Sequence, residues 1–250
     1  MRLKVLDATI KLQKRGSAFA SAKLYALHED CKTLINHAAT YNAYLFGRNM
    51  KDIYILKNSK KGIEATGRDK TKHKEMYTEC KKISDVMLEH LLPLKQEKLS
   101  KEIRKIAEHI ETTIYCSTKS IKATKNIYRD IQNMKDSESK TLQQIYKTFS
   151  EQSKEFFIYV ASITEKEHTK KNFQELKIAL QKIETYHIGF IEMVTKLVNK
   201  KVDLEEIDIP SLINVDHYVY QSAKNMVKAL QNTYLTEEEE TAFEEMEDAR

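Results

Sequence analysis

An acid, a tyrosine, a serine and a lysine follow one another near the end of the chain and could together carry chemistry. In NVDHYVYQSAKNMVKAL (214–230), Asp216, Tyr220 and Lys224 stand at four-residue steps, and Ser222 lies between the last two. Short-chain dehydrogenases also use a tyrosine and a lysine four residues apart, but they require a Rossmann sheet with a glycine-rich fingerprint. The sequence contains no such fingerprint, so the pair does not indicate a dehydrogenase.

The angles around a helix assign these four side chains to different faces. Ser222 falls on the apolar seam of its helix, whereas Asp216, Tyr220 and Lys224 turn away from it by about 90°, 130° and 170°. We therefore expect Ser222 to let a neighbouring helix approach closely. The other three residues are expected to diverge from the core and to form no pocket.

Two pairs have the spacing of metal ligands. Glu184 and His187 stand three residues apart, as in di-iron bundles, but those sites need a second such motif and two more glutamates. Asp85 and Glu89 stand four residues apart and so share one helix face. Taken singly, His187 is expected to be a hydrogen-bonded core residue, and Asp85 and Glu89 to be solvated. A divalent metal is the alternative if all four meet, and no other cofactor is expected. The remaining histidines show no shared spacing: His28, His37, His73, His90, His109, His168 and His217.

The sequence shows no sign of an enzyme. Cys31, Cys80 and Cys116 have no CxxC spacing and lie on or beside apolar helical faces, which predicts buried free thiols in a reducing cytosol. There is no glycine-rich phosphate loop and no nucleophile elbow. We expect no catalytic activity.

The composition predicts an all-α chain without membrane spans. Among 250 residues there are 5 glycines and 2 prolines, too few for the turns of a β-sandwich or barrel. The longest apolar runs, such as FFIYVA (156–161), are far shorter than the roughly 20 residues that cross a bilayer. No signal peptide pattern opens the sequence. A cytoplasmic location is therefore expected.

Apolar residues at alternating three- and four-residue steps predict six helices in an elongated antiparallel bundle. We expect the second helix to be interrupted near Pro93 and the third helix to be continuous. The sixth helix is expected to be capped by Asp208, with Pro210 in its first turn. Residues 56–72 read as an exposed connection. The expected helices are 17–46, a second around 76–94, 98–134, 137–163, a fifth around 173–197, and a sixth from about 209.

Charge is distributed unevenly along the chain. Residues 236–250 hold eight acids and one arginine, so residues 1–235 carry +12 against an overall +5. The acidic tail is expected to be a frayed, solubilising end or a short helix capped by Thr236. The basic body lacks an arginine-rich cluster with interleaved aromatics, so no nucleic-acid partner is expected.

The sixth-helix pattern occurs a second time, 105 residues earlier, in EHIETTIYCSTKSIKA (108–123). Because the two copies close the first and second groups of three helices, we expect a tandem duplication with pseudo-twofold symmetry. The units would span about 15–135 and 137–235. Glu111 aligns with Asp216, Tyr115 with Tyr220, Ser117 with Ser222, and Lys119 with Lys224.

Two stretches carry a resemblance to a known family. IYCSTKSIKATKNIYRDI (114–131) and LEEIDIPSLINVDHYVYQSAKNMVKAL (204–230) resemble the PhoU-like domain at the cytoplasmic end of bacterial sodium/phosphate cotransporters. The resemblance covers roughly residues 68–235. It implies a regulatory domain tied to phosphate uptake at the inner face of the membrane. Its partner would be the membrane part of a transporter or a signalling protein, with a homodimer as a further option.

The chain departs from the family at its metal motif. PhoU proteins bind metal through repeated Glu/Asp-x-x-x-Asp motifs, and the only one here is Glu244 to Asp248 in the tail. The nearest helical substitute is Asp85 to Glu89. Two alternatives therefore stay open: a free-standing PhoU-like metal-binding regulator, and a basic helical scaffold that lies on acidic membranes.

Overall fold

The computed structural model describes residues 20–47, 72–165, 172–200 and 208–248, and every regular element in these ranges is a helix. The expected all-α class is confirmed. The expected connection at 56–72 lies outside the described residues except for Lys72, and so does His168. The helices are α2 (Ala20–Leu45), α3 (Lys72–Lys95), α4 (Lys101–Asn126), α5 (Tyr128–Asp136), α6 (Lys140–Thr164), α7 (Asn172–Asn199), α8 (Ile209–Tyr234) and α9 (Glu237–Asp248).

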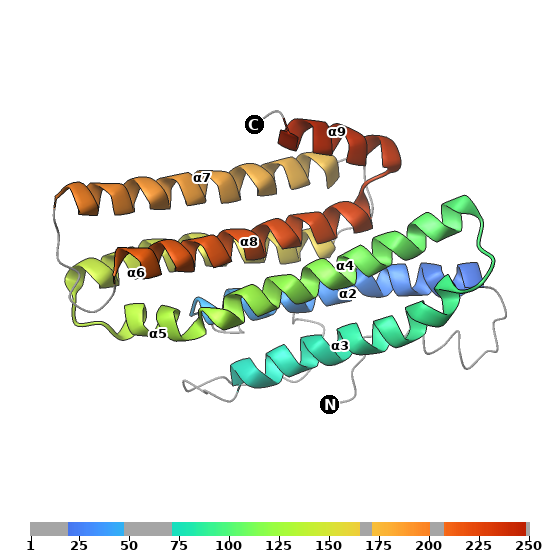
Figure 1. The fold of residues 1–250 in the computed structure, drawn as a ribbon, viewed down its shortest axis with the longest axis horizontal. Coiled ribbons are helices and arrows are strands. Elements are labelled where there is room, and N and C mark those ends of the chain that lie inside the picture. Colours follow the sequence, from blue (N-terminus) through green and yellow to red (C-terminus); the bar gives the residue numbers. More distant parts are fainter. Residues whose placement is uncertain (1–19, 48–71, 166–171, 201–207, 249–250) are drawn as a thin grey trace.

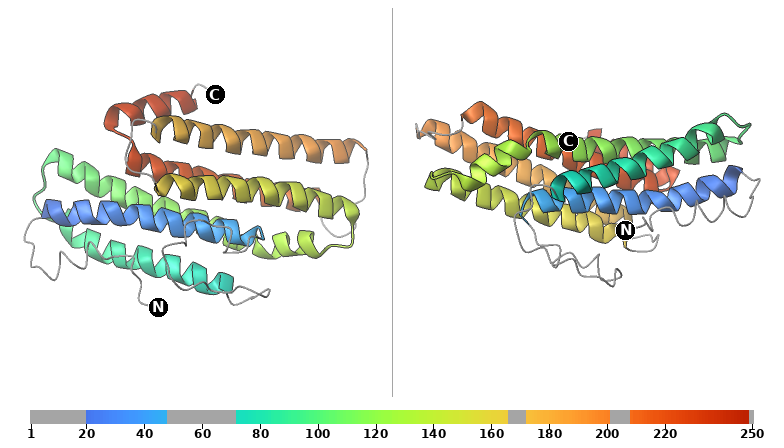
Figure 2. Two further views of the ribbon diagram at one scale, coloured as in Figure 1. Left: turned by 180° about the vertical axis from the view of Figure 1, so that it is seen from behind. Right: turned by 90° about the horizontal axis from the view of Figure 1, so that it is seen from below.

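The six long helices α2, α3, α4, α6, α7 and α8 lie side by side along the long axis of the molecule, which is elongated as expected (Figures 1 and 2). α4 and α8 pack against each other at the centre, and α2 packs on α3, α4 and α6. α7 covers α8 and α6, while α3 and α7 lie at opposite edges (Figure 1). In chain order, the long helices α2, α3 and α4 precede the short helix α5, and α6, α7 and α8 follow it.

Local signals place several helix ends where the sequence predicts them. Asp208 caps α8 by accepting a hydrogen bond from Ser211 N at 2.7 Å, and Pro210 occupies the first turn. Gly47 follows the end of α2 with a φ of 87°, a left-handed conformation that glycine adopts without steric cost. Pro93 lies inside the last turn of α3, which ends two residues later at Lys95.

The expected continuous helix over 98–134 is wrong. α4 ends at Asn126, Ile127 leaves the helical conformation with φ −98° and ψ 7°, and α5 starts at Tyr128. The break lets α5 turn its apolar side onto the core, where Ile127 and Ile131 are each 1% exposed. No glycine or proline marks this position, so the apolar period alone could not predict the break.

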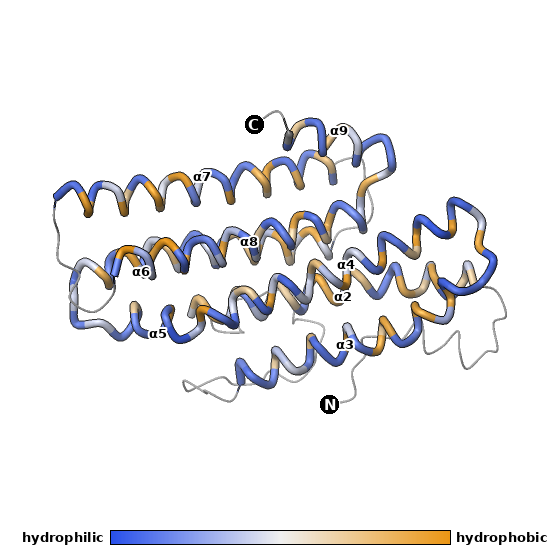
Figure 3. Tube along the Cα trace, in the orientation of Figure 1, coloured by the Kyte–Doolittle hydropathy of each residue, from blue (hydrophilic) through white to orange (hydrophobic). Residues whose placement is uncertain are grey.

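Hydrophobic and hydrophilic residues alternate along each helix (Figure 3), and the buried hydrophobic residues form two clusters between the helices. A smaller cluster joins the first half of α2 to α3 and the first half of α4, around Leu27, Met87 and Ile110. A larger cluster joins the second half of α2 to α4–α9, around Phe156 and Met226. No helix in the described ranges is long and apolar enough to cross a membrane.

The acidic tail is a packed helix. Of the two options expected for it, the frayed end is wrong and the capped helix is confirmed. Thr236 N donates to Glu239 Oε2 at 3.0 Å, and Glu239 N donates to Thr236 Oγ1 at 3.4 Å, which forms a reciprocal capping box. Phe243 on α9 is fully buried. α9 therefore belongs to the folded body.

Candidate functional site

Three polar side chains from α7 and α8 converge at one place. His187 Nδ1 on α7 lies 2.5 Å from Asp216 Oδ2 on α8, and the His187 ring stacks on Tyr220 with centroids 4.4 Å apart. The expectation that Asp216 and Tyr220 diverge from the core is therefore wrong. They do turn away from the seam that faces α4, but α7 covers that side of α8.

A cavity of about 30 Å³ adjoins this cluster, which we call the His187 cluster (His187, Asp216 and Tyr220). A volume of this size exceeds the roughly 10–15 Å³ needed for one water molecule. Ser153 and Gln152 of α6 also line it, beside a mostly aromatic wall. The remaining lining residues are Phe149, Phe156, Phe157, Ile183, Tyr186, Val219 and Ala223.

Burial controls the electrostatics of the pair. The Asp216 side chain is 5% exposed and that of His187 is 32% exposed. Desolvation raises the pKa of Asp216 to about 6, while the nearby imidazoles of His187 and His217 act in the opposite direction. Asp216 therefore holds a proton to higher pH than an exposed aspartate does, and its contact with Nδ1 orients the imidazole of His187.

The geometry suits proton binding or a small polar ligand better than nucleophilic catalysis. A histidine that activates a nucleophile is normally hydrogen-bonded to it and held in place by an acid. Asp216 supplies the acid, but no serine, threonine or cysteine in the described residues is hydrogen-bonded to His187. The imidazole edge opposite Nδ1 makes no hydrogen bond with that part of the chain.

Ser222 lies at a different place, a polar junction between α2, α4 and α8 that is closed to solvent. Asn42 Nδ2 donates to Ser120 Oγ at 2.8 Å and to Ser222 Oγ at 3.2 Å. The two serine hydroxyls are 2.7 Å apart, and Thr124 Oγ1 donates to Asn42 Oδ1 at 2.6 Å. This network, the Asn42 junction (Asn42, Ser120, Thr124 and Ser222), holds three helices in one register and exposes no group for chemistry.

The earlier copy of the motif shares some of this geometry. Ser117 is fully buried like Ser222, and Lys119 Nζ lies 5.1 Å from the centre of the Tyr115 ring, as Lys224 lies 5.9 Å from that of Tyr220. The acids differ, because Glu111 is half exposed and pairs with Lys95 on α3. The His187 cluster thus has no counterpart in the first copy.

The four candidate metal ligands do not meet. Asp85 and Glu89 are exposed on α3, whereas Glu184 and His187 lie on α7 at the opposite edge (Figure 1). Among the described residues there is no group of three or more histidine, cysteine or acidic side chains that could hold a metal ion.

The three cysteines are free and buried. Burial raises the pKa of all three thiols, to about 12 for Cys80 and about 11 for Cys116. The reactive thiolate is therefore disfavoured at each position.

We expect Lys224→Ala to change the free energy of unfolding by less than about 0.5 kcal/mol, because solvent screens exposed ion pairs. Lys224 is 41% exposed, and its Nζ lies 3.4 Å from Glu247 Oε1. Urea unfolding checks this, with Lys119→Ala as the matched change in the first copy. A loss of several kcal/mol would show that Lys224 faces the core.

Comparison with protein-family models, curated proteins and solved structures found no match to the chain.

Proposed function

We propose that the chain is a PhoU-like regulatory domain of sodium-dependent phosphate transport, which acts by contact with another protein at the cytoplasmic face of the membrane. The packing of equivalent helices carries the proposal: α2 packs on α6 and α4 on α8, while α3 and α7 lie outermost. Two copies of a three-helix unit related by a twofold axis would pack in this way.

The direction of the central helices supports the same relation. Thr113 and Thr233 hydroxyls lie 3.3 Å apart, and Ser120 and Ser222 hydroxyls 2.7 Å apart. Moving forward along α4 thus moves backward along α8, so the two helices are antiparallel. Equivalent helices that meet across a twofold axis perpendicular to their length are antiparallel, so this arrangement agrees with the duplication expected from the sequence.

The two alternatives find less support. A metal-binding regulator would need Asp85 and Glu89 close to Glu184 and His187, and these pairs lie at opposite edges. A basic scaffold on acidic membranes would need free cationic side chains on one face. On α4 and α8, Lys105, Lys224 and Lys228 are instead paired with α9.

The proposal is tested by removing codons 20–248 in frame from the native gene and measuring uptake of radiolabelled phosphate with and without sodium. The sodium-dependent component should change, and restoring the codons should reverse the change. Chemical crosslinking in the same cells should join the chain to a membrane transporter or a signalling protein. Unchanged sodium-dependent uptake at both low and high phosphate would contradict the proposal.

A further inference from the structure

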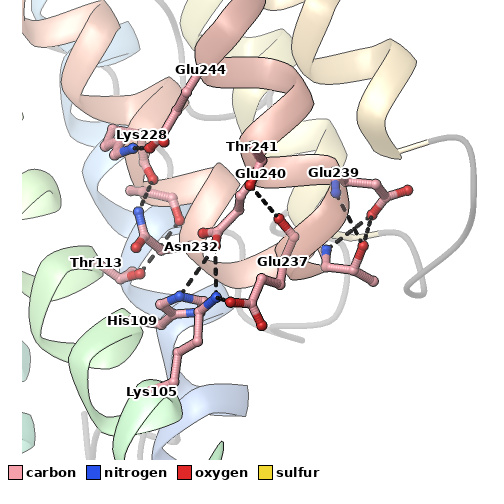
Figure 4. A network of polar contacts seen from close by, with 12 residues as sticks. Lys105, His109, Thr113, Lys228, Asn232, Glu237, Glu239, Glu240, Thr241 and Glu244 are labelled. Atoms are coloured by element: carbon pink, nitrogen blue, oxygen red, sulfur yellow. Dashed lines mark hydrogen bonds and ion pairs between the residues drawn. The ribbon is translucent and has the colours of Figure 1, made fainter.

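The acidic helix α9 binds the body of the protein through one regular stripe of glutamates. Glu237, Glu240, Glu244 and Glu247 follow one another at steps of three, four and three residues, which places them on one helix face. Figure 4 shows how this face meets side chains from α4 and α8. The helix thus presents a negative edge to the bundle.

The first half of the stripe contacts α4. Lys105 Nζ lies 3.1 Å from Glu237 Oε1 and 3.7 Å from Glu240 Oε2, and His109 Nε2 lies 3.4 Å from Glu240 Oε2 (Figure 4). Lys105 and His109 are one helical turn apart, so both point towards the same edge of α4.

The second half contacts α8 in the same manner. Lys228 Nζ lies 2.8 Å from Glu244 Oε1, and Lys224 Nζ lies 3.4 Å from Glu247 Oε1. We call Lys105, His109, Lys224 and Lys228 the basic surface. Its two pairs, each one turn apart on its own helix, match the spacing of a helical stripe of acids.

An apolar contact lies beside the basic surface. Phe243 is fully buried, and its ring meets that of Phe173 on α7 edge-on at 5.9 Å and 87°. Met246 packs partly buried against the same core. The surface that binds α9, formed by the basic surface and the apolar contact at Phe173, is called its seat. The seat thus recognises both charge and shape, because it binds acids on one face of α9 and an aromatic ring on the next.

The contacts that hold α9 are of a kind that another ligand can displace. Of the four paired glutamates, Glu237 and Glu244 are 77% and 58% exposed, and salt screens exposed ion pairs. Glu240 and Glu247 are less exposed, at 16% and 24%. A helix of 12 residues is marginal in water without tertiary contacts. α9 therefore needs its contacts with the seat to stay helical. The seat needs α9 only to cover its surface.

We propose that the basic surface, together with the apolar contact at Phe173, is the docking site for an acidic amphipathic helix of a partner protein, and that α9 occupies it when the partner is absent. This inference rests on the proposed function, since it names the contact surface of a domain that acts through protein contact. A partner helix displaces α9 when its contacts outweigh the high effective concentration of the tethered segment.

A protein helix fits this surface better than a lipid surface does. Anionic headgroups would satisfy the lysines, but they would not supply an aromatic ring at a fixed place beside the charges. Within each pair the two cationic groups stand one helical turn apart, a spacing that a helix matches and a fluid bilayer does not.

The test uses the full chain and a fluorescein-labelled peptide of residues 235–250 as the probe. Glu240→Lys with Glu244→Lys should release α9, seen as faster hydrogen exchange of its amides. Glu238→Lys with Glu245→Lys is the matched control, because it changes the charge equally at exposed positions without ion pairs to the described residues. Fluorescence anisotropy then measures binding of the peptide to each protein.

We expect the peptide to bind the released variant about tenfold more tightly than the wild type or the control, because no tethered helix competes. Phe243→Ala in the peptide, or raised salt, should weaken binding about tenfold. Equal binding to all three proteins would overturn the proposal, as would unchanged exchange of α9 in the Glu240/Glu244 variant. Binding of that variant to phosphatidylglycerol vesicles but not to the peptide would assign the surface to lipid instead. None of these outcomes depends on phosphate uptake, so the two proposals can fail separately.

Discussion

His187→Ala should destabilise the folded chain by about 3 kcal/mol at pH 7, because it leaves a buried carboxyl without its partner. Asp216 is 4% exposed, and its Oδ2 lies 2.5 Å from His187 Nδ1. The change also removes one face of the stack with Tyr220. Guanidinium unfolding followed by circular dichroism measures the loss.

Asp216→Asn is the control that separates the polar pair from simple packing. In the double variant His187→Ala/Asp216→Asn there is no buried carboxyl to strand. The double variant should therefore be more stable than the sum of the two single changes predicts. Additive losses would show that His187 and Asp216 are not coupled.

The same pair predicts a pH dependence with a definite sign. Burial raises the pKa of Asp216 in the folded chain to about 6, above its ordinary 3.8, so the folded state holds this proton more tightly than the unfolded state. The contribution of this proton to stability is complete below about pH 4 and is lost as pH rises through 6. Over this range the free energy of unfolding falls by up to about 1.4 kcal/mol per pH unit.

Asp216→Asn should therefore reduce the change in unfolding free energy between about pH 4 and pH 6. His187→Ala should move the window to higher pH, because His187 is one of the groups that lower the pKa of Asp216. Unfolding curves between pH 4 and 8 check both shifts. Parallel pH profiles for wild type and Asp216→Asn would contradict the raised pKa.

Ser222→Leu should cost about 3 kcal/mol or prevent folding, since it inserts a large side chain into a closed junction of three helices. Ser222 is fully buried and bonds Asn42 and Ser120. Ser222→Ala, which adds no volume, should cost about 1–2 kcal/mol because Asn42 and Ser120 lose a partner. Urea unfolding gives both values.

The aligned Ser117 supplies a matched comparison. It is equally buried, but its hydroxyl has no hydrogen-bond partner among the described residues. Ser117→Ala should therefore be neutral or slightly stabilising, because it removes an unsatisfied polar group. If Ser117→Ala and Ser222→Ala cost the same, the hydrogen bonds of the Asn42 junction contribute nothing to stability.

Local chemistry made much of the fold predictable. Asp208 and Pro210 begin α8 as expected, Gly47 ends α2, and the apolar period marks the long helices. The apolar period gives no sign of the break at Ile127, because the short turn between α4 and α5 carries no glycine or proline. The apolar period continues across this position, and the packing of α5 onto the core decides where α4 ends.

The candidate site was less predictable than the helices. His187 was expected to be a hydrogen-bonded core residue, and it does bond Asp216, although it stays partly exposed. The sequence does not identify Asp216 as the partner of His187, because the angle around α8 turns Asp216 away from the apolar seam. The acidic stripe of α9 was visible in the sequence at steps of three and four, but its cationic partners lie on two helices distant in the chain.

The sequence by itself determined the helical class, the helix caps, the buried serine at position 222 and the uneven charge. Each of these depends on residue type and on the angle around one helix. Only the tertiary structure decided that α7 covers Asp216 and Tyr220, and that α9 covers Lys105 and Lys228. Helical periodicity sets the direction in which a side chain leaves its own helix, but it does not say which other helix lies in that direction.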